Sequence, residues 1–189
     1  MFYWLPTALF CSFLLLAGCA TQPPLPTLGQ IPAFKTLTDH FAKPFDSTAQ
    51  LQQKIWVADF FFTSCPGPCP RMSSQMHQVQ AAFANEDRLL LVSFTVDPTH
   101  DSVPVLSEYS KHFEAIPGKW FFLTGPQKDL DFLAKDAFKL GTVDGSLEHS
   151  TRFALVDGAS RVRAYYLTSE KDAIERLIAD ARRLLKEPT

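Results

Sequence analysis

Apolar residues follow two patterns along this chain: short continuous runs, and longer stretches with helical spacing. The runs at 54–62 (KIWVADFFF) and 88–96 (RLLLVSFTV) are nearly all apolar, as expected for strands buried on both faces. A shorter run at 120–124 predicts a third strand. Apolar residues three and four positions apart, together with capping and turn residues at their ends, predict helices over 71–84, 103–113, 127–138 and 171–185.

A hairpin is predicted before the last helix. Strands at 153–156 and 161–166 are separated by Asp157-Gly158, a pair that favours a tight turn. Strands that alternate with helices predict an α/β fold, with a central mixed sheet flanked by helices and closed by a C-terminal β-hairpin and helix. The chain contains no internal repeat, and we expect a single folded domain.

The composition narrows the functional classes. The 189 residues are 46% hydrophobic and 20% charged, which argues against a disordered chain. A net charge of -2 provides no basic surface, so we expect no nucleic-acid partner. No apolar run reaches the roughly 18–20 uninterrupted residues of a spanning helix, which excludes a multi-spanning protein. The 17 Phe residues predict an aromatic-rich core.

The N-terminus is predicted to be a targeting segment. Residues 1–18 are almost entirely apolar and run into LAGC (16–19), which resembles a bacterial lipobox, in which Cys19 is lipidated and becomes the new N-terminus. The positive side chain usual before the apolar stretch is missing and Pro6 interrupts it, so an uncleaved membrane anchor is the alternative. Either form places the protein on the periplasmic side of a membrane. Ala20 favours the outer over the inner membrane.

A proline-rich segment follows the lipidation site. Residues 19–32 contain Pro23, Pro24, Pro26 and Pro32. Prolines at this density favour an extended chain of about 3.1 Å per residue. We therefore expect a tether over 19–32 and a folded domain over 33–189.

Two cysteines remain for the folded domain. Of the four in the chain, Cys11 falls in the removed segment and Cys19 carries the lipid, which leaves Cys65 and Cys69. Both are expected on the first turn of the helix that follows the first strand, where the helix N-terminus lowers thiol pKa. Thiolates are nucleophiles and soft metal ligands, so this pattern leaves redox exchange and metal binding open.

Four motifs together resemble one family. FFTSCPGPCPRMSSQM (61–76), TVDPTHDSVPVLSEY (95–109), WFFLTG (120–125) and EHSTRFALVDGASRVRAYY (148–166) are similar, in this order, to the Sco/SenC family. The family comprises copper-binding, thioredoxin-fold proteins of cytochrome c oxidase assembly. The resemblance extends from about Phe34 to the final helix. Two positions depart from the family pattern, His100 in place of Arg and Gln53-Lys54 in place of Gly-Lys.

The resemblance implies a thioredoxin-like fold and a copper site made of Cys65, Cys69 and His149. It links Asp97, in the VDP motif, to function beside the site or in contact with a partner. Two thiolates and one imidazole suit Cu(I), and a fourth ligand would accommodate Cu(II). The implied function is that of a copper metallochaperone rather than an enzyme. Its expected partner is the copper-site subunit of cytochrome c oxidase, or another periplasmic copper or thiol protein.

Other functions remain open at this point. In a thiol–disulfide oxidoreductase, Cys65 would attack a partner disulfide and Cys69 would resolve the mixed disulfide. Such enzymes usually carry a cis-proline in the loop facing the cysteines, where this chain has His149 and no proline, which favours a metal site. A structural disulfide and a copper-dependent sensor are further alternatives. Met72 and Met76 are predicted to pack in the core. Four histidines show no metal-binding spacing and are predicted on the surface: His40, His77, His100 and His112.

Overall fold

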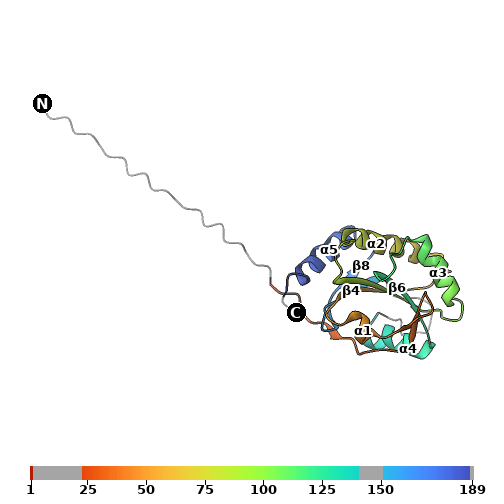
Figure 1. The fold of residues 1–189 in the computed structure, drawn as a ribbon. Helices are drawn as coiled ribbons and strands as arrows, with labels where there is room; N and C mark the ends of the chain where they lie inside the picture. Colours follow the sequence, from red (N-terminus) through yellow and green to blue (C-terminus); the bar gives the residue numbers. More distant parts are fainter. Residues whose placement is uncertain (2–22, 141–150, 188–189) are drawn as a thin grey trace.

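A computed structural model describes residues 1, 23–140 and 151–187 of the chain (Figure 1). The strands are β1 (Gly29–Gln30), β2 (Leu37–Asp39), β3 (Pro44–Phe45), β4 (Ile55–Phe61), β5 (Leu89–Thr95), β6 (Trp120–Thr124), β7 (Arg152–Val156) and β8 (Arg161–Leu167). The helices are α1 (Ser47–Leu51), α2 (Cys69–Ala82), α3 (Val103–His112), α4 (Gln127–Phe132), the π-helix η1 (Leu133–Ala137) and α5 (Ala173–Leu184).

The described strands form one mixed sheet in the order β1-β8-β7-β4-β5-β6-β2-β3. Strands β4, β5 and β6 are parallel, and every other neighbouring pair is antiparallel. All residues of β4 and β5 are buried, as their continuous apolar runs predicted. The predicted α/β class, mixed sheet and closing hairpin are confirmed. The carboxyl ends of β4, β5 and β6 meet at one edge of the sheet, which is where open α/β sheets bind ligands.

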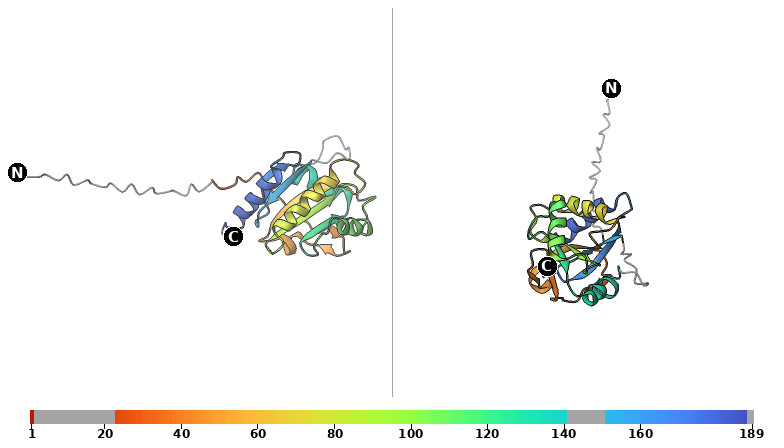
Figure 2. Two further views of the ribbon diagram at one scale, coloured as in Figure 1. Left: turned by 90° about the horizontal axis from the view of Figure 1, so that it is seen from above. Right: turned by 90° about the vertical axis from the view of Figure 1, so that its right-hand side faces the viewer.

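Helices cover both faces of the sheet. Figure 1 shows α2, α3 and α5 on one face and α1 and α4 on the other, and Figure 2 shows α2 and α5 side by side. Each face has its own apolar core. Phe60, Phe94 and Phe138 pack together in the core on the α4 and η1 side, with ring centroids 5.1 to 5.7 Å apart. Phe61 and Phe122 pack under α2 and α3. Phenylalanine side chains thus fill the apolar core on both faces of the sheet.

Residues 29–51 contain four short elements that the sequence pattern did not predict. Strands β1, β2 and β3 have two or three residues each, and α1 has five. Elements of this length do not repeat a helical or strand period often enough for the apolar pattern to reveal them. Asp46 caps α1, since its side chain accepts hydrogen bonds from the backbone N–H groups of Thr48 and Ala49.

The proline-rich segment lies against the domain from Pro23 onward. The backbone N–H of Leu28 donates to the carbonyl of Val162 (2.7 Å), and β1 pairs with β8. The guanidinium of Arg163 donates to the carbonyls of Leu25 and Pro26. Residues 23–32 therefore belong to the folded unit, ahead of the boundary at 33 that the prolines suggested. These contacts lie at the start of β8, at the sheet edge opposite the carboxyl end of β4.

Gly158, in the turn between β7 and β8, is required by a close backbone approach. A Cβ atom at this position would lie 2.9 Å from Cα and 3.0 Å from the carbonyl carbon of Gln53. We expect Gly158→Ala to destabilise the protein by about 1–3 kcal/mol in urea unfolding, because backbone must move to accept the methyl group. The control is Gly29→Ala, whose Cβ would have nothing within 4 Å. Equal stability of the two variants would contradict this explanation.

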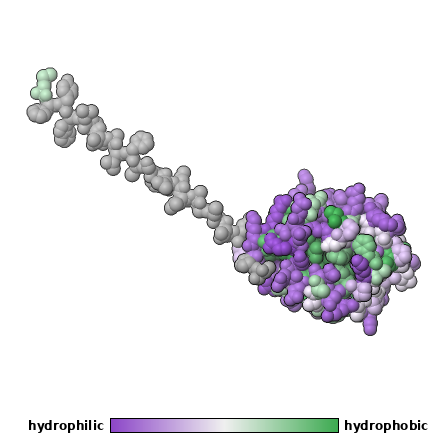
Figure 3. Space-filling view, in the orientation of Figure 1, coloured by the Kyte–Doolittle hydropathy of each residue, from purple (hydrophilic) through white to green (hydrophobic). Residues whose placement is uncertain are grey.

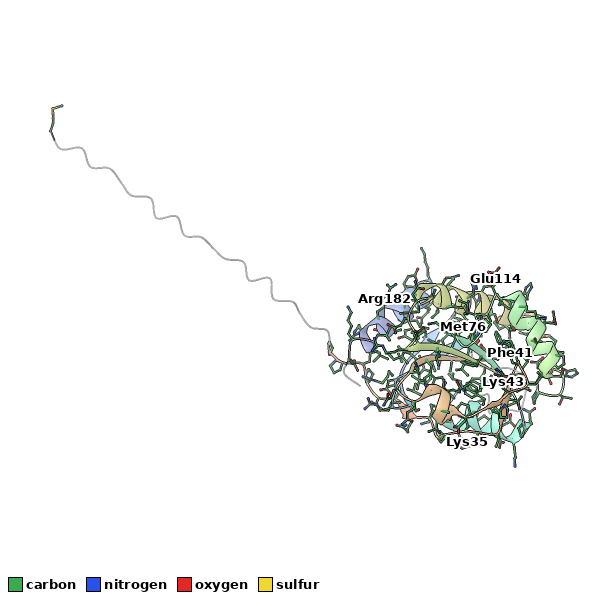
Figure 4. All side chains as sticks on the ribbon, viewed as in Figure 1. Lys35, Phe41, Lys43, Met76, Glu114 and Arg182 are labelled. Carbon is green, nitrogen blue, oxygen red and sulfur yellow. The ribbon has the colours of Figure 1, made fainter. Side chains whose placement is uncertain are left out.

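The surface is mainly hydrophilic in the view of Figure 3, with a hydrophobic area on the side where Figure 4 labels Phe41. Phe41 is 46% exposed and follows β2. Among the described residues, no helix is long and apolar enough to cross a membrane.

Candidate functional site

The two cysteines lie at the carboxyl end of β4, in and after a tight loop. The backbone N–H of Cys65 donates to the carbonyl of Phe62 (3.3 Å) within this loop, and α2 begins four residues later at Cys69. Pro68 is the N-cap, and its carbonyl accepts the first helical hydrogen bond from Met72 (2.9 Å). The prediction that both cysteines share the first helical turn is therefore wrong. The loop carries Cys65, and the helix carries Cys69.

Both cysteines are thiols and both are buried. Cys69 has no exposed surface and Cys65 is 8% exposed. Burial is the main cause that raises the pKa of the Cys69 thiol, and a hydrogen bond with the Cys65 thiol adds to it. The lowering expected from the helix N-terminus is thus outweighed for Cys69. A thiolate at Cys69 is therefore costly unless a metal cation binds it or a proton neutralises it as it forms.

The loop before Cys65 is held by Asp101, a fully buried carboxylate. It accepts hydrogen bonds from the backbone N–H of Thr63 (3.1 Å) and from the hydroxyls of Thr63 and Thr95 (2.5 Å each). The Thr95 hydroxyl in turn accepts from the backbone N–H of Asp97 (3.0 Å). Asp101 therefore joins the cysteine loop after β4 to the turn after β5.

We expect Asp101→Asn to cost about 1.5–3 kcal/mol in urea unfolding. The amide replaces one acceptor oxygen by a donor, and hydrogen bonds to a charged group are the stronger ones. The exposed Asp87 offers a matched control, since Asp87→Asn changes the same charge without touching this network. Equal stability of the two variants would contradict the conclusion that the Asp101 hydrogen bonds hold the cysteine loop in place.

Asp97 lies in this turn after β5 and is 9% exposed. Its carboxylate is 2.7 Å from Nδ1 of His100, whose side chain is 74% exposed, and this contact raises the pKa of the imidazole. The structure thus places Asp97 at the same sheet edge as the cysteines, through the Asp101 network. Its charge is paired with His100, at the position where the family pattern has Arg.

Two further predictions concern the surroundings of the cysteines. Met72 and Met76 are fully buried in the core layer that contains Cys65 and Cys69, so the prediction of core packing is confirmed. Figure 4 shows Met76 between α2 and the sheet. The prediction that His40 lies on the surface is wrong: it is buried against the Phe122 ring, and its Nδ1 accepts a hydrogen bond from the backbone N–H of Phe122. Burial lowers its pKa.

His149, Cys19 and Ala20 lie outside the described residues, as does the signal segment apart from Met1. Within the described ranges, no group of three or more His, Cys, Asp or Glu side chains could hold a metal ion. The sheet topology nevertheless locates the described residues that follow His149 in the chain. Strand β7 is antiparallel to β4, so its first residue, Arg152, lies at the edge where β4 ends.

Sequence reasoning also missed the buried acid Asp59 in β4. It is 1% exposed and accepts a hydrogen bond from the Ser93 hydroxyl (2.5 Å), while its Oδ2 atom has no hydrogen-bond partner. Burial raises its pKa to about 7. The available signal was the single acid inside the apolar run KIWVADFFF, which was interpreted only as a buried strand.

The chain is similar to one family over nearly its whole folded part. The family model described as SCO1/SenC matches residues 30–186. A putative copper-binding protein of Stutzerimonas stutzeri is 31% identical over 164 residues, which are 82% of this chain and 78% of that protein.

Two solved structures are also similar. A SCO1/SenC family lipoprotein from Bacillus anthracis has a TM-score of 0.77 and 30% identity, covering 87% of this chain and 100% of the other. BsSco, described as a member of the Sco family of cytochrome c oxidase assembly proteins with a disulfide switch, has a TM-score of 0.75 and 25% identity over 88% of this chain and 100% of the other.

Proposed function

The chain belongs to the SCO1/SenC family, and from this premise we propose that it is a copper metallochaperone. Cys65, Cys69 and His149 hold one copper ion as cargo, and the protein delivers it to the copper site of a respiratory cytochrome oxidase. The observation that carries the proposal is the pair of buried, mutually hydrogen-bonded thiols at the carboxyl edge of the sheet. The printed descriptions of its relatives, which name copper binding and oxidase assembly, support the same cargo and recipient.

The donor set suits copper. Two sulfurs and one imidazole nitrogen are soft and borderline ligands, which Cu(I) prefers in low coordination. Chain continuity supports His149 as the third ligand. It precedes Thr151 by two residues, which span at most about 7 Å, and the carbonyl of Thr151 accepts a hydrogen bond from the backbone of Thr168 at the cysteine edge of the sheet.

A Cu(I) titration tests this function. The reduced full-length chain in detergent, titrated anaerobically against a chelator of known affinity, is expected to bind one equivalent. Cys65→Ser and Cys69→Ser should abolish this binding, and His149→Ala should weaken it by more than about tenfold. His112→Ala is the matched control, because His112 is exposed on α3. Absence of stoichiometric uptake, or equal affinity of His149→Ala and the wild type, would reject the proposal.

We propose thiol–disulfide exchange as a second activity of the same cysteines. The observation that favours it is the contact between the two thiols, since cysteines that hydrogen-bond to each other are close to the geometry of a disulfide. Cys65 is the one with exposed surface and is therefore the sulfur that a partner attacks. The disulfide switch printed for BsSco points in the same direction.

Lipid attachment at Cys19 remains part of the proposal. The lipoprotein from Bacillus anthracis, similar over the folded domain, supports it. Because residues 23–32 are bound at the opposite sheet edge, a lipid at Cys19 holds the domain with its cysteines directed away from the membrane. Metabolic labelling with a fatty acid, lost in Cys19→Ala, is the expected result, and labelling that persists in this variant would contradict it.

A further inference from the structure

Four exposed basic side chains lie near the docked N-terminal segment. We call them the basic surface: Arg88, Arg161, Arg182 and Lys186. Arg88, Arg161 and the chain that follows α5 line one cavity of about 220 Å³, so these parts of the domain lie side by side. The guanidinium of Arg182 lies over the ring of Phe83 (5.7 Å from Cζ to the ring centroid), at the end of α2. Figure 4 labels Arg182 at this end of the domain.

The basic surface lies at the sheet edge opposite the cysteines. Arg88 directly precedes β5, and Arg161 is the first residue of β8, which runs in the same direction as β4. The first described residue of the N-terminal segment, Pro23, is bound here, because its carbonyl accepts a hydrogen bond from the guanidinium of Arg183 (2.5 Å). Cys19 precedes Pro23 by four positions, which span at most about 14 Å. With a lipid on Cys19, the basic surface is therefore held close to the membrane.

Acidic side chains neutralise only part of this charge. Arg88 and Arg161 each form an ion pair with a neighbouring acid (3.3 and 2.8 Å). Arg182 and Lys186 form no ion pair with any residue that the structure describes. The loop before β5 also carries Asp87, which is exposed. The whole chain has 20 acidic and 18 basic side chains, so the basic excess is local and the rest of the chain is acidic.

The position and the charge of the basic surface select its partner. A folded protein about 30 Å across does not fit into a gap of about 14 Å between the domain and the lipid, whereas the membrane surface is always within reach. Anionic phospholipids give a membrane a negative potential that attracts Lys and Arg and decays within about 10 Å. The same potential repels the acidic remainder of the domain, so the attraction also sets an orientation.

We propose that the basic surface binds the anionic phospholipid headgroups of the membrane that holds the Cys19 lipid. The inference rests on the lipid attachment proposed above. The lipid and the basic surface then form two attachments, and a basic cluster next to a lipid chain is a known means of strengthening an anchor. With both attachments made, the domain stands on this edge of its sheet, and the opposite edge presents Cys65 and Cys69 to a partner.

The test is the acetylation rate of Lys186 by an amine reagent, measured by mass spectrometry on the lipidated chain in vesicles. Vesicles of phosphatidylcholine are compared with vesicles that also contain phosphatidylglycerol, and the exposed Lys128 of α4 is the internal reference. At low salt, Lys186 is expected to react about fivefold more slowly on the anionic vesicles, and high salt should remove the difference. Equal rates of Lys186 on the two kinds of vesicle would overturn the proposal.

Two double variants of equal net charge separate this surface from the charge of the whole protein. Arg88→Glu with Arg182→Glu should abolish the protection of Lys186, whereas Lys43→Glu with Lys171→Glu, at exposed positions elsewhere, should retain it. Loss of protection in both pairs would overturn the proposal. Lipid on Cys19 is verified by the mass of the intact chain. Its absence would reject the attachment together with this inference, whereas lipidated wild type without protection of Lys186 would reject the inference alone.

Discussion

Asp59→Asn is expected to be more stable than the wild type at pH 8 by about 4 kcal/mol, with the two proteins becoming similar near pH 4. Burial raises the pKa of Asp59 from 3.8 to about 7 in the folded chain. Between these values the folded chain holds a proton that the unfolded chain has released, so wild-type stability falls as pH rises through this window and levels off above it. The asparagine variant has no such proton and lacks this contribution.

Urea unfolding at half-unit steps from pH 4 to pH 8 measures this difference. All other titrating groups are shared, so they cancel in the comparison of the two proteins. Asp136→Asn, at an exposed position of η1, should follow the wild-type curve. Parallel curves for Asp59→Asn and the wild type would contradict the raised pKa of Asp59.

Arg163→Ala is expected to cost about 3 kcal/mol and to detach the N-terminal segment. The Arg163 side chain is 6% exposed and pairs with Asp157 (2.9 Å) and Glu187 (3.3 Å) while donating to the carbonyls of Leu25 and Pro26. Removing it leaves the buried carboxylate of Asp157 with only Arg161 as its cationic partner and the carbonyls of Leu25 and Pro26 without this donor. Burial by itself raises the pKa of Asp157, but its hydrogen bonds, which include those from Arg161, outweigh burial and keep this pKa low. Because Arg161 remains in the variant, we expect a stability loss at the lower end of the range for breaking a buried ion pair.

Arg161→Ala is the matched control for this prediction. Arg161 contacts the same carboxylate (2.8 Å), but its side chain is 46% exposed and has no contact with residues 23–28 among its hydrogen bonds. Its loss should cost less than about 1 kcal/mol. Limited proteolysis should cleave within residues 23–28 faster in Arg163→Ala and at the wild-type rate in Arg161→Ala. Equal cleavage of the two variants would contradict the role of Arg163 as the tie of this segment.

The long helices and strands, and their order, were predictable because each has a recognisable pattern of apolar residues. The runs that became β4 and β5 were located to within a residue at either end, since a strand buried on both faces must be apolar throughout. The cysteine motif was also evident from its residues. The final part of the helix predicted over 127–138 is the π-helix η1, whose wider turn leaves the spacing of apolar residues nearly unchanged over five residues.

The protonation behaviour of the site was not predictable in the same way. A helix N-terminus lowers thiol pKa, but Cys69 is fully buried in the core layer that α2 covers, and desolvation outweighs the dipole. His40 and Asp59 illustrate the same limit, since one polar residue in a sequence does not reveal whether folding buries it. The docking of residues 23–32 depends on Arg163, more than 130 positions away.

The α/β class, the family and the pair of sulfurs at the end of a central strand could be inferred without coordinates, because they follow from local patterns and motifs. The burial of each sulfur, the carboxyl groups buried near the pair and the sheet edge that binds the N-terminal segment became known from the folded chain. The reason is physical: desolvation and long-range hydrogen bonds depend on what the fold packs against a residue, and those neighbours come from distant parts of the chain.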